Sequence, residues 1–387
     1  MSLHALVGHE HTRRALVRAH AVDALPSSLL LHGARGIGKQ HLALWLARLT
    51  VCESPGDGPC DSCGPCRMAL SLEHPDIHWY FPLQRPKGVS GDRLVSALER
   101  DRFAELSELR AHAVRGSCVD EVRGIYLGMV TSLRATATRR PTMADGPVFI
   151  VGQAETLVPQ EASPEAANAL LKILEEPPGD ARFILTSSEP GLLLPTIRSR
   201  TVPLHVPPLS QDEVRGFLTE HTDAESRVID WATGLGQGSP GRALSFLPDG
   251  DGLGPLELLR RRAYDIVVSA TSKEPAAGYS LAISFPPAGA RKLIDLFSFV
   301  EEWLRDLAAV AAGADHLVFN RDALPKLQQH VASGAFEAVD VTDAFLSVES
   351  ARELARGNVN PQLVVSGLVR DLRRALHHSH LVSGKAQ

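Results

Sequence analysis

Short apolar segments bounded by glycine or polar residues mark the first half of the chain. They lie at residues 28–31, 146–152 and 181–189. Each is too short for a typical helix and nearly continuous in apolar residues, which predicts strands buried on both faces. A helix is expected after the first strand, with apolar surface from Leu42, Leu44, Leu46 and Leu49. Alternating strands and helices predict a mostly parallel sheet covered on both faces, with ligands at the carboxyl ends of the strands.

The second half of the chain carries a helical pattern. Segment 293–307 has apolar residues three or four positions apart, at Leu293, Leu296, Phe297, Val300, Leu304 and Leu307. Segment 341–357 ends on Gly357, a residue that commonly follows a helix. A stretch rich in Gly, Pro and Asp at 247–255 is the expected linker. We therefore expect an all-helical second half.

Composition limits the function classes. The chain has 387 residues, enough for two or three domains, and its 44% hydrophobic and 22% charged residues are ordinary for a globular protein. Its net charge of -5 does not by itself indicate nucleic-acid binding, so DNA contact would need local basic patches or helix N-termini. No apolar run approaches the length of a membrane span, and the N-terminus lacks a secretory pattern, so we expect a cytoplasmic protein with no membrane partner.

Four of the five cysteines form one group. Cys52, Cys60, Cys63 and Cys66 have the spacing C-x7-C-x2-C-x2-C, which can direct four thiolates at one tetrahedral zinc ion. A disulfide pair is an alternative but needs an oxidising compartment, and an iron–sulfur cluster is another because similar spacings occur in ferredoxins. We favour structural zinc. Cys118 stands apart and is expected to be a small buried residue.

A glycine loop follows the first predicted strand. Gly33, Gly36, Gly38 and Lys39 have the spacing G-x4-G-K of a phosphate-binding loop, or P-loop, in which backbone N–H groups and the lysine bind phosphates. The next residue normally supplies a hydroxyl to Mg²⁺, but here it is Gln40, and an amide is a poor substitute.

The second predicted strand lacks the expected acidic residues. P-loop ATPases end this strand in carboxylates that hold the metal and polarise the attacking water. Here Gly152 and Gln153 follow the strand. Position 40 and the pair 152–153 therefore both lack groups that hydrolysis needs. The pattern indicates the fold of a P-loop ATPase without ATPase activity.

Five segments together resemble a known family. They are "LVGHEHTRRAL" at 6–16, "HGARGIGK" at 32–39, "ANALLKILEEPP" at 167–178, "LLPTIRSRT" at 193–201 and "GNVNPQL" at 357–363. They resemble the bacterial DNA polymerase III clamp loader of the AAA+ class. The resemblance implies an α/β AAA+ P-loop core over 1–207, a small helical lid over 208–250 and an all-α collar over 255–387. The core would contain the four-cysteine zinc module, 52–66, and a helical insertion at about 84–122.

Within this family the lost ATPase groups favour the delta-prime branch. The resemblance then implies that Arg200 acts as an arginine finger on ATP held by a neighbouring subunit, and that Zn²⁺ is structural while ATP and Mg²⁺ binding is doubtful. Implied partners are the gamma/tau and delta subunits and, through the complex, the sliding clamp and primed DNA. The alternatives are an active gamma/tau-like subunit and an autonomous nucleic-acid-dependent ATPase.

Further positions have weaker implied roles. Ser187 and Ser188 correspond to the first-sensor region, and Arg242 lies near the second-sensor position. Glu175 and Glu176 precede two prolines at an expected helix end, where paired carboxylates are typical of a solvated face, so we assign them no catalysis.

Overall fold

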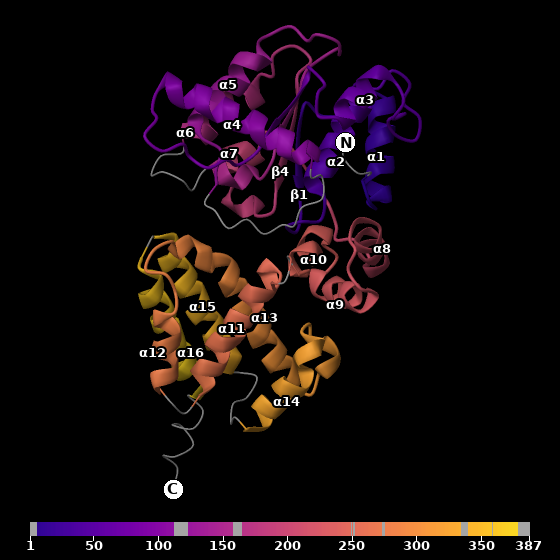
Figure 1. Cartoon of the computed structure of the whole chain (residues 1–387). Helices are drawn as coiled ribbons and strands as arrows, with labels where there is room; N and C mark the ends of the chain where they lie inside the picture. The colour runs from indigo at the N-terminus through magenta and orange to yellow at the C-terminus, as the bar shows by residue number, and fades with distance from the viewer. Residues whose placement is uncertain are drawn as a thin grey trace. The chain divides into compact units, whose positions relative to one another are not determined.

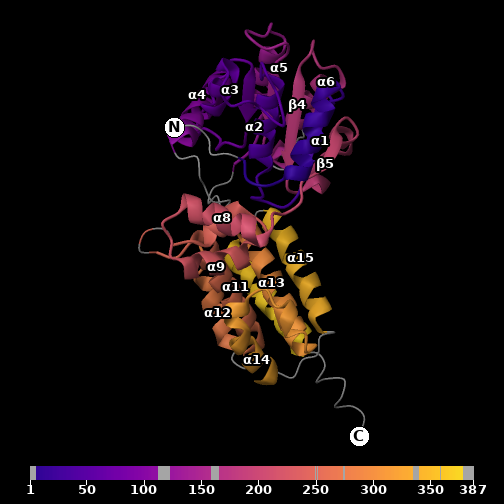
Figure 2. The same ribbon diagram turned by 90° about the vertical axis from the view of Figure 1, so that its right-hand side faces the viewer.

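The computed structural model of this chain describes residues 6–111, 123–157, 165–248, 250, 252–272, 275–333, 340–357 and 359–377. The chain forms two compact units (Figures 1 and 2), which divide between Leu244 and Ser245. The predicted role of Cys118 falls outside the described residues.

The first unit contains a parallel sheet of five strands in the order β2-β3-β4-β1-β5. The strands are β1 (Ser28–His32), β2 (Ile77–Tyr80), β3 (Val148–Val151), β4 (Arg182–Ser187) and β5 (Val202–His205). β1, β3 and β4 confirm the three predicted strands. The two strands that the pattern missed, β2 and β5, form the edges of the sheet.

Helices cover both faces of this sheet (Figure 1). On one side lie α1 (Glu10–Ala21), α2 (Lys39–Thr50) and α3 (Gly64–Leu70); on the other lie α4 (Asp92–Ala111), α5 (Leu127–Ala137) and α6 (Glu165–Glu175). The core between the layers includes Leu31, Phe149 and Phe183, all 0% exposed. The rings of Phe149 and Phe183 stack at a centroid distance of 5.2 Å across β3 and β4. The predicted parallel α/β sheet with helices on both faces is thereby confirmed.

Helix α4 occupies much of the predicted insertion at 84–122. Its buried face includes Leu98, Leu106 and Arg102, whereas Phe103 is 58% exposed. The Arg102 guanidinium lies 4.6 Å from the centroid of the Tyr80 ring and donates a hydrogen bond to the Trp79 carbonyl. Arg102 thus attaches the insertion to the edge strand β2.

Short elements complete the first unit and connect it to the second. They are η1 (Ala154–Leu157), η2 (Pro190–Leu192), α7 (Pro195–Arg198), α8 (Gln211–His221), α9 (Ser226–Gly236) and α10 (Pro240–Phe246). Ser210 and Glu213 form a capping box at the start of α8, each satisfying a backbone N–H of the other. The unit boundary falls inside α10, a few residues before the linker expected at 247–255.

The described part of the second unit is mainly helical. Its longer helices are α11 (Pro255–Thr271), α12 (Pro275–Ile283), α13 (Leu293–Ala311), α14 (Leu324–Ser333), α15 (Asp340–Arg356) and α16 (Pro361–His377). The 3-10 turns are η3 (Ala290–Lys292), η4 (Asp315–Leu317) and η5 (Arg321–Ala323). α13 and α15 confirm the predicted helices at 293–307 and 341–357. Over the described ranges of the chain, no helix has the length and apolarity needed to cross a membrane.

A buried polar network orders the middle of this helical unit. Arg260 on α11 is 5% exposed and pairs with Glu257 at 2.7 Å and with Asp322 at 2.5 Å. Asp306 on α13 is fully buried and accepts hydrogen bonds from the backbone N–H groups of Phe319 and Asn320. Because a buried carboxylate needs such donors, these contacts fix the chain that joins α13 to α14.

Candidate functional site

The P-loop has the backbone geometry that its glycines predict. It joins β1 to α2, and Gly36 and Gly38 have φ values of 76° and 96°, a region that favours glycine. A Cβ atom on Gly33 would lie 2.3 Å from the Val206 carbonyl oxygen. These three positions therefore need glycine for the loop to close against the ends of the strands.

Lys39 is buried and points back into its own loop. Its Nζ donates hydrogen bonds to the carbonyl oxygens of Gly33 at 2.8 Å and Ala34 at 2.6 Å, and to Ser188 Oγ at 2.9 Å. An ammonium group has three donors, so all three have partners within the chain. Burial lowers the pKa of Lys39 to about 8, an effect that the nearby negative charge of Glu155 opposes.

Glu155 is a residue of this site that the sequence pattern did not single out. It lies in η1, beyond the two positions where ATPases carry their carboxylates. Its Oε1 accepts a hydrogen bond from the backbone N–H of Ser188 at 3.0 Å. Ser188, a candidate for the first-sensor residue, thus contacts both Lys39 and Glu155 of its own chain. The neighbouring Ser187 is fully buried, and its Oγ accepts from the Glu189 N–H at 3.2 Å.

Gln40 and Gly152 lie against each other. A Cβ atom on Gly152 would be 2.7 Å from Gln40 Oε1 and 2.9 Å from Gln40 Cδ. The carboxamide therefore covers the carboxyl end of β3, where a metal-binding side chain would begin. Gln153 follows with φ of 52°, and its N–H donates to Thr186 Oγ1 on β4 at 3.1 Å. The residues that replace the two ATPase carboxylates thus have structural contacts.

Further hydrogen bonds engage the other side of the P-loop. The Arg35 carbonyl accepts from Ser239 Oγ at 2.8 Å, and the Gly36 carbonyl accepts from the Gly241 N–H at 3.0 Å. The Ile37 carbonyl accepts from His9 Nε2 at 2.8 Å. These bonds connect the loop to the start of α10 and to the N-terminal segment.

The second-sensor candidate contacts the helices of the predicted lid. Arg242 donates from Nε to the Leu235 carbonyl in the last turn of α9 at 3.0 Å. This bond orients at least one side of its guanidinium toward α9.

Arg200 lies between α7 and β5 and is partly exposed, with 34% of its side chain accessible. Its Nη1 donates to the Thr196 carbonyl at 3.1 Å, and its Nη2 forms an ion pair with Glu175 at the end of α6. Strands β1 and β5 are parallel, with Leu29 opposite Val202 and His32 opposite His205. Arg200 comes just before β5 and therefore lies at the amino-terminal end of the strands, whereas the P-loop follows β1 at their carboxyl-terminal end. The four residues of β5, at about 3.3 Å each, separate these two ends.

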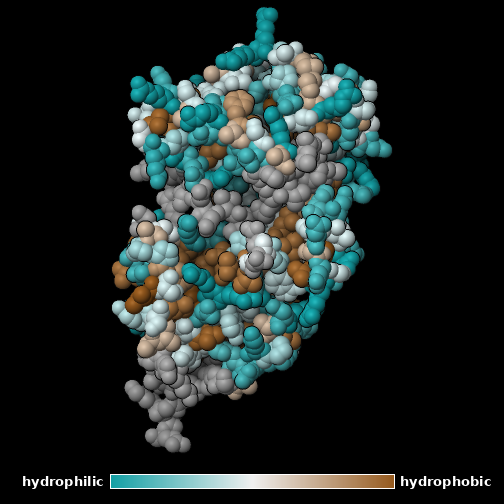
Figure 3. Space-filling view, in the orientation of Figure 1, coloured by the Kyte–Doolittle hydropathy of each residue, from teal (hydrophilic) through white to brown (hydrophobic). Residues whose placement is uncertain are grey.

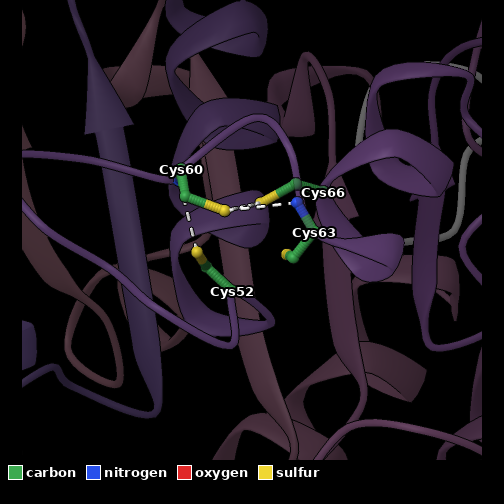
Figure 4. Close-up of side chains that lie close together, drawn as sticks. All are labelled: Cys52, Cys60, Cys63 and Cys66. Carbon is green, nitrogen blue, oxygen red and sulfur yellow. Dashed lines mark hydrogen bonds between the residues drawn. The ribbon is translucent and has the colours of Figure 1, made fainter.

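The four predicted cysteine ligands converge at the start of α3 (Figure 4). The Sγ atoms of Cys52, Cys60, Cys63 and Cys66 all lie within 4.8 Å of one another. A zinc ion with bonds of about 2.3 Å needs sulfurs separated by roughly 3.8 Å in a tetrahedron, so small side-chain adjustments complete the geometry. The structure therefore contains a four-cysteine cluster that could hold a metal ion.

Backbone and neighbouring side chains hold this cluster in place. The N–H of Cys60 points at Cys52 Sγ at 3.2 Å, and the N–H of Cys63 points at Cys60 Sγ at 3.3 Å. Arg48 on α2 forms an ion pair with Asp61 at 2.9 Å. These contacts hold the cysteine sulfur atoms in position before any metal binds, as outer contacts of metal sites do.

Comparisons with known proteins identify the family. The family described as "DNA polymerase III, delta subunit" matches residues 8–210, more than half of the chain. The delta' subunit of Bacillus subtilis is 23% identical over 352 residues, which cover 90% of this chain and 91% of that protein. The delta' subunit of Pseudomonas aeruginosa is 30% identical over 213 residues, covering 54% and 52%. The tau subunit of Salmonella typhimurium is 27% identical over 257 residues, which cover 64% of this chain and 33% of that longer protein. The chain belongs to the DNA polymerase III delta-subunit family and is a clamp-loader subunit of that polymerase.

Proposed function

We propose that this chain is a delta-prime-like subunit that does not hydrolyse ATP itself. The contact between Gln40 and Gly152 carries the proposal, because a carboxamide covers the place where Mg²⁺ and its carboxylate ligand are needed. The three internal bonds of Lys39 support it, since a phosphate would have to compete with acceptors already in place.

We further propose that Arg200 acts on ATP held by a neighbouring subunit. The guanidinium is partly exposed and lies at the amino-terminal end of the strands, opposite the end that carries its own P-loop. It is therefore poorly placed to reach a phosphate in its own chain. A guanidinium fork can stabilise the charge that develops on a transferring phosphoryl group of another subunit.

In this proposal the cysteine cluster holds structural Zn²⁺. A single ion draws four sulfurs to one centre, whereas the thiolates of a four-iron cluster bind different iron atoms and lie farther apart. The mutual distances below 4.8 Å favour the single ion. Zinc would link the end of α2 to the start of α3 and contribute to folding.

The proposed partners are the gamma/tau and delta subunits in the cytoplasm, with the sliding clamp and primed DNA reached through the complex. Figure 3 shows apolar side chains gathered on the visible face of the helical unit. Exposed large apolar residues of this unit include Tyr279, Ile283, Leu346 and Leu363, each more than half accessible. Such exposure is typical of a surface that other subunits cover and supports a collar role.

One observation favours the alternative of an active ATPase. Glu155 brings a carboxylate close enough to Lys39 to affect its pKa. Glu155 lies two positions beyond the place of the expected glutamate, and its carboxylate accepts a hydrogen bond from the Ser188 N–H. The inactive form therefore remains the proposal, and substitution of Glu155 is a control for it.

Reconstitution of the complex tests the trans role of Arg200. Arg200→Ala should leave this chain folded and assembled but lower the DNA- and clamp-stimulated ATPase, because a trans arginine contributes about 10³-fold or more at its site. Activity should fall partially, since other sites remain. Arg198→Ala, at a neighbouring exposed arginine, is the matched control. Equal ATPase in wild-type and Arg200→Ala complexes would reject the proposed role, and failed assembly would make Arg200 structural.

A further inference from the structure

Glu175 occupies an electrostatically unfavourable position. It is the last residue of α6, and Pro177 and Pro178 follow shortly after it. The carboxyl end of a helix carries partial negative charge from unpaired carbonyl groups, so a carboxylate there is destabilised and a cation stabilised. A second carboxylate, Glu176, comes next in sequence and adds like charge.

The Arg200 guanidinium compensates this charge. It pairs with Glu175 through Nη2 while Nη1 donates to the Thr196 carbonyl of α7. Two elements that are separate in sequence, α6 and α7, therefore hold one guanidinium from two directions. The side chain of Arg200 is long and flexible, and two anchors restrict the rotamers that a single backbone contact would allow.

We infer that Glu175 is a positioning residue for Arg200, an inference that rests on the proposed trans role of this arginine. The carboxylate fixes the plane of the guanidinium at the protein surface. A guanidinium that is already held in place loses less conformational freedom when it contacts a phosphate. More of the interaction free energy is therefore available to stabilise the transition state.

The contacts with Thr196 and Glu175 leave some N–H donors of the guanidinium free to contact a phosphate. A guanidinium has five N–H donors, and Thr196 and Glu175 engage one on each terminal nitrogen. The remaining donors can face a neighbouring subunit. Glu175 is itself 45% exposed in its side chain, so its replacement should not disturb the core of the first unit.

Glu176 provides the matched control. It is also exposed and carries the same charge at the same helix end, but the described structure shows no ion pair for it. General charge effects at the end of α6 should therefore appear in both variants, whereas loss of Arg200 positioning should appear only when Glu175 changes.

The experiment measures steady-state ATPase of the reconstituted complex with DNA and clamp, over a range of ATP concentrations. Glu175→Ala should lower kcat by roughly half or more of the loss that Arg200→Ala causes, with KM for ATP little changed, because misplacing a group that acts in the transition state mainly affects kcat. Glu175→Gln keeps an acceptor oxygen and should recover part of the loss. Glu176→Ala should match wild type, and Glu175→Ala combined with Arg200→Ala should match Arg200→Ala alone.

Each other outcome overturns a defined part of the account. Wild-type kinetics for Glu175→Ala beside a reduced Arg200→Ala would reject the positioning role and leave the trans arginine intact. Increased activity of Glu175→Ala would mean that the carboxylate restrains the arginine, which contradicts the inference. Wild-type kinetics for Arg200→Ala would reject the proposed function, and the positioning role with it. A double variant clearly below Arg200→Ala would show that Glu175 acts independently of Arg200.

Discussion

The carboxamide of Gln40 lies directly over Gly152, close enough that a Cβ atom at position 152 would be 2.7 Å from Gln40 Oε1. The two departures from the ATPase pattern therefore fit each other in space. Gln40 is accommodated because position 152 has no side chain, and a side chain at 152 would need the space that the glutamine occupies.

This relationship predicts an energetic coupling between the two positions. Gly152→Asp should lower the free energy of unfolding because the new side chain displaces the Gln40 carboxamide. Gln40→Thr should make room for it, so the double variant should be more stable than the two single effects predict. We expect a coupling of about 1 kcal/mol from a double-mutant cycle in urea. Strictly additive effects would mean that Gln40 moves aside without cost.

The buried ammonium of Lys39 predicts a pH-dependent stability difference. Its pKa falls from an ordinary 10.5 to about 8 because burial disfavours the charged form. Between pH 8 and 10 the unfolded chain keeps a proton that the folded chain releases, so this lysine makes the free energy of unfolding rise with pH. The stability of wild type relative to Lys39→Met should therefore increase over this interval.

Urea unfolding at several pH values measures this difference. Lys172→Met on α6 is the matched control, because it makes the same substitution at an exposed lysine. A difference between wild type and Lys39→Met that stays flat or shrinks from pH 8 to 10 would contradict the buried position of the ammonium.

Structural zinc predicts a colourless protein with about one zinc per chain. Cys66→Ser should lower the zinc content and the stability, because this cysteine is fully buried within the cluster. Cys118→Ser should keep the zinc, since this cysteine stands apart in sequence. Elemental analysis after anaerobic purification decides the question. Visible absorbance with bound iron would favour a cluster instead, and absence of both metals would reject a metal site.

The central strands could be predicted from sequence, but the edge strands could not. β1, β3 and β4 are buried on both faces, so they appear as continuous apolar runs. β5 reads Val-Pro-Leu-His and is largely exposed, and β2 is buried only at its last two residues. Edge strands tolerate proline and polar residues because one side lacks a partner strand.

Several residues of the candidate site could be predicted from sequence, but Glu155 and the contacts between distant residues could not. Sequence spacing identified Lys39, Gln40 and the four cysteines, because these motifs are local. The contact of Gln40 with Gly152 and the ion pair of Arg200 with Glu175 join positions far apart in the chain. Sequence patterns at Glu175 indicated a solvated face, and tertiary folding gave its carboxylate a specific cation.

ATP turnover by the purified chain with Mg²⁺, measured beside Lys39→Ala and Glu155→Gln, distinguishes an inactive P-loop from an active one. Because Gln40 covers the metal position and Lys39 is engaged within its own loop, wild type should show no turnover above either variant. Turnover in wild type that both substitutions abolish would contradict the account. It would identify an active ATPase that uses Glu155 in place of the carboxylates missing after β3.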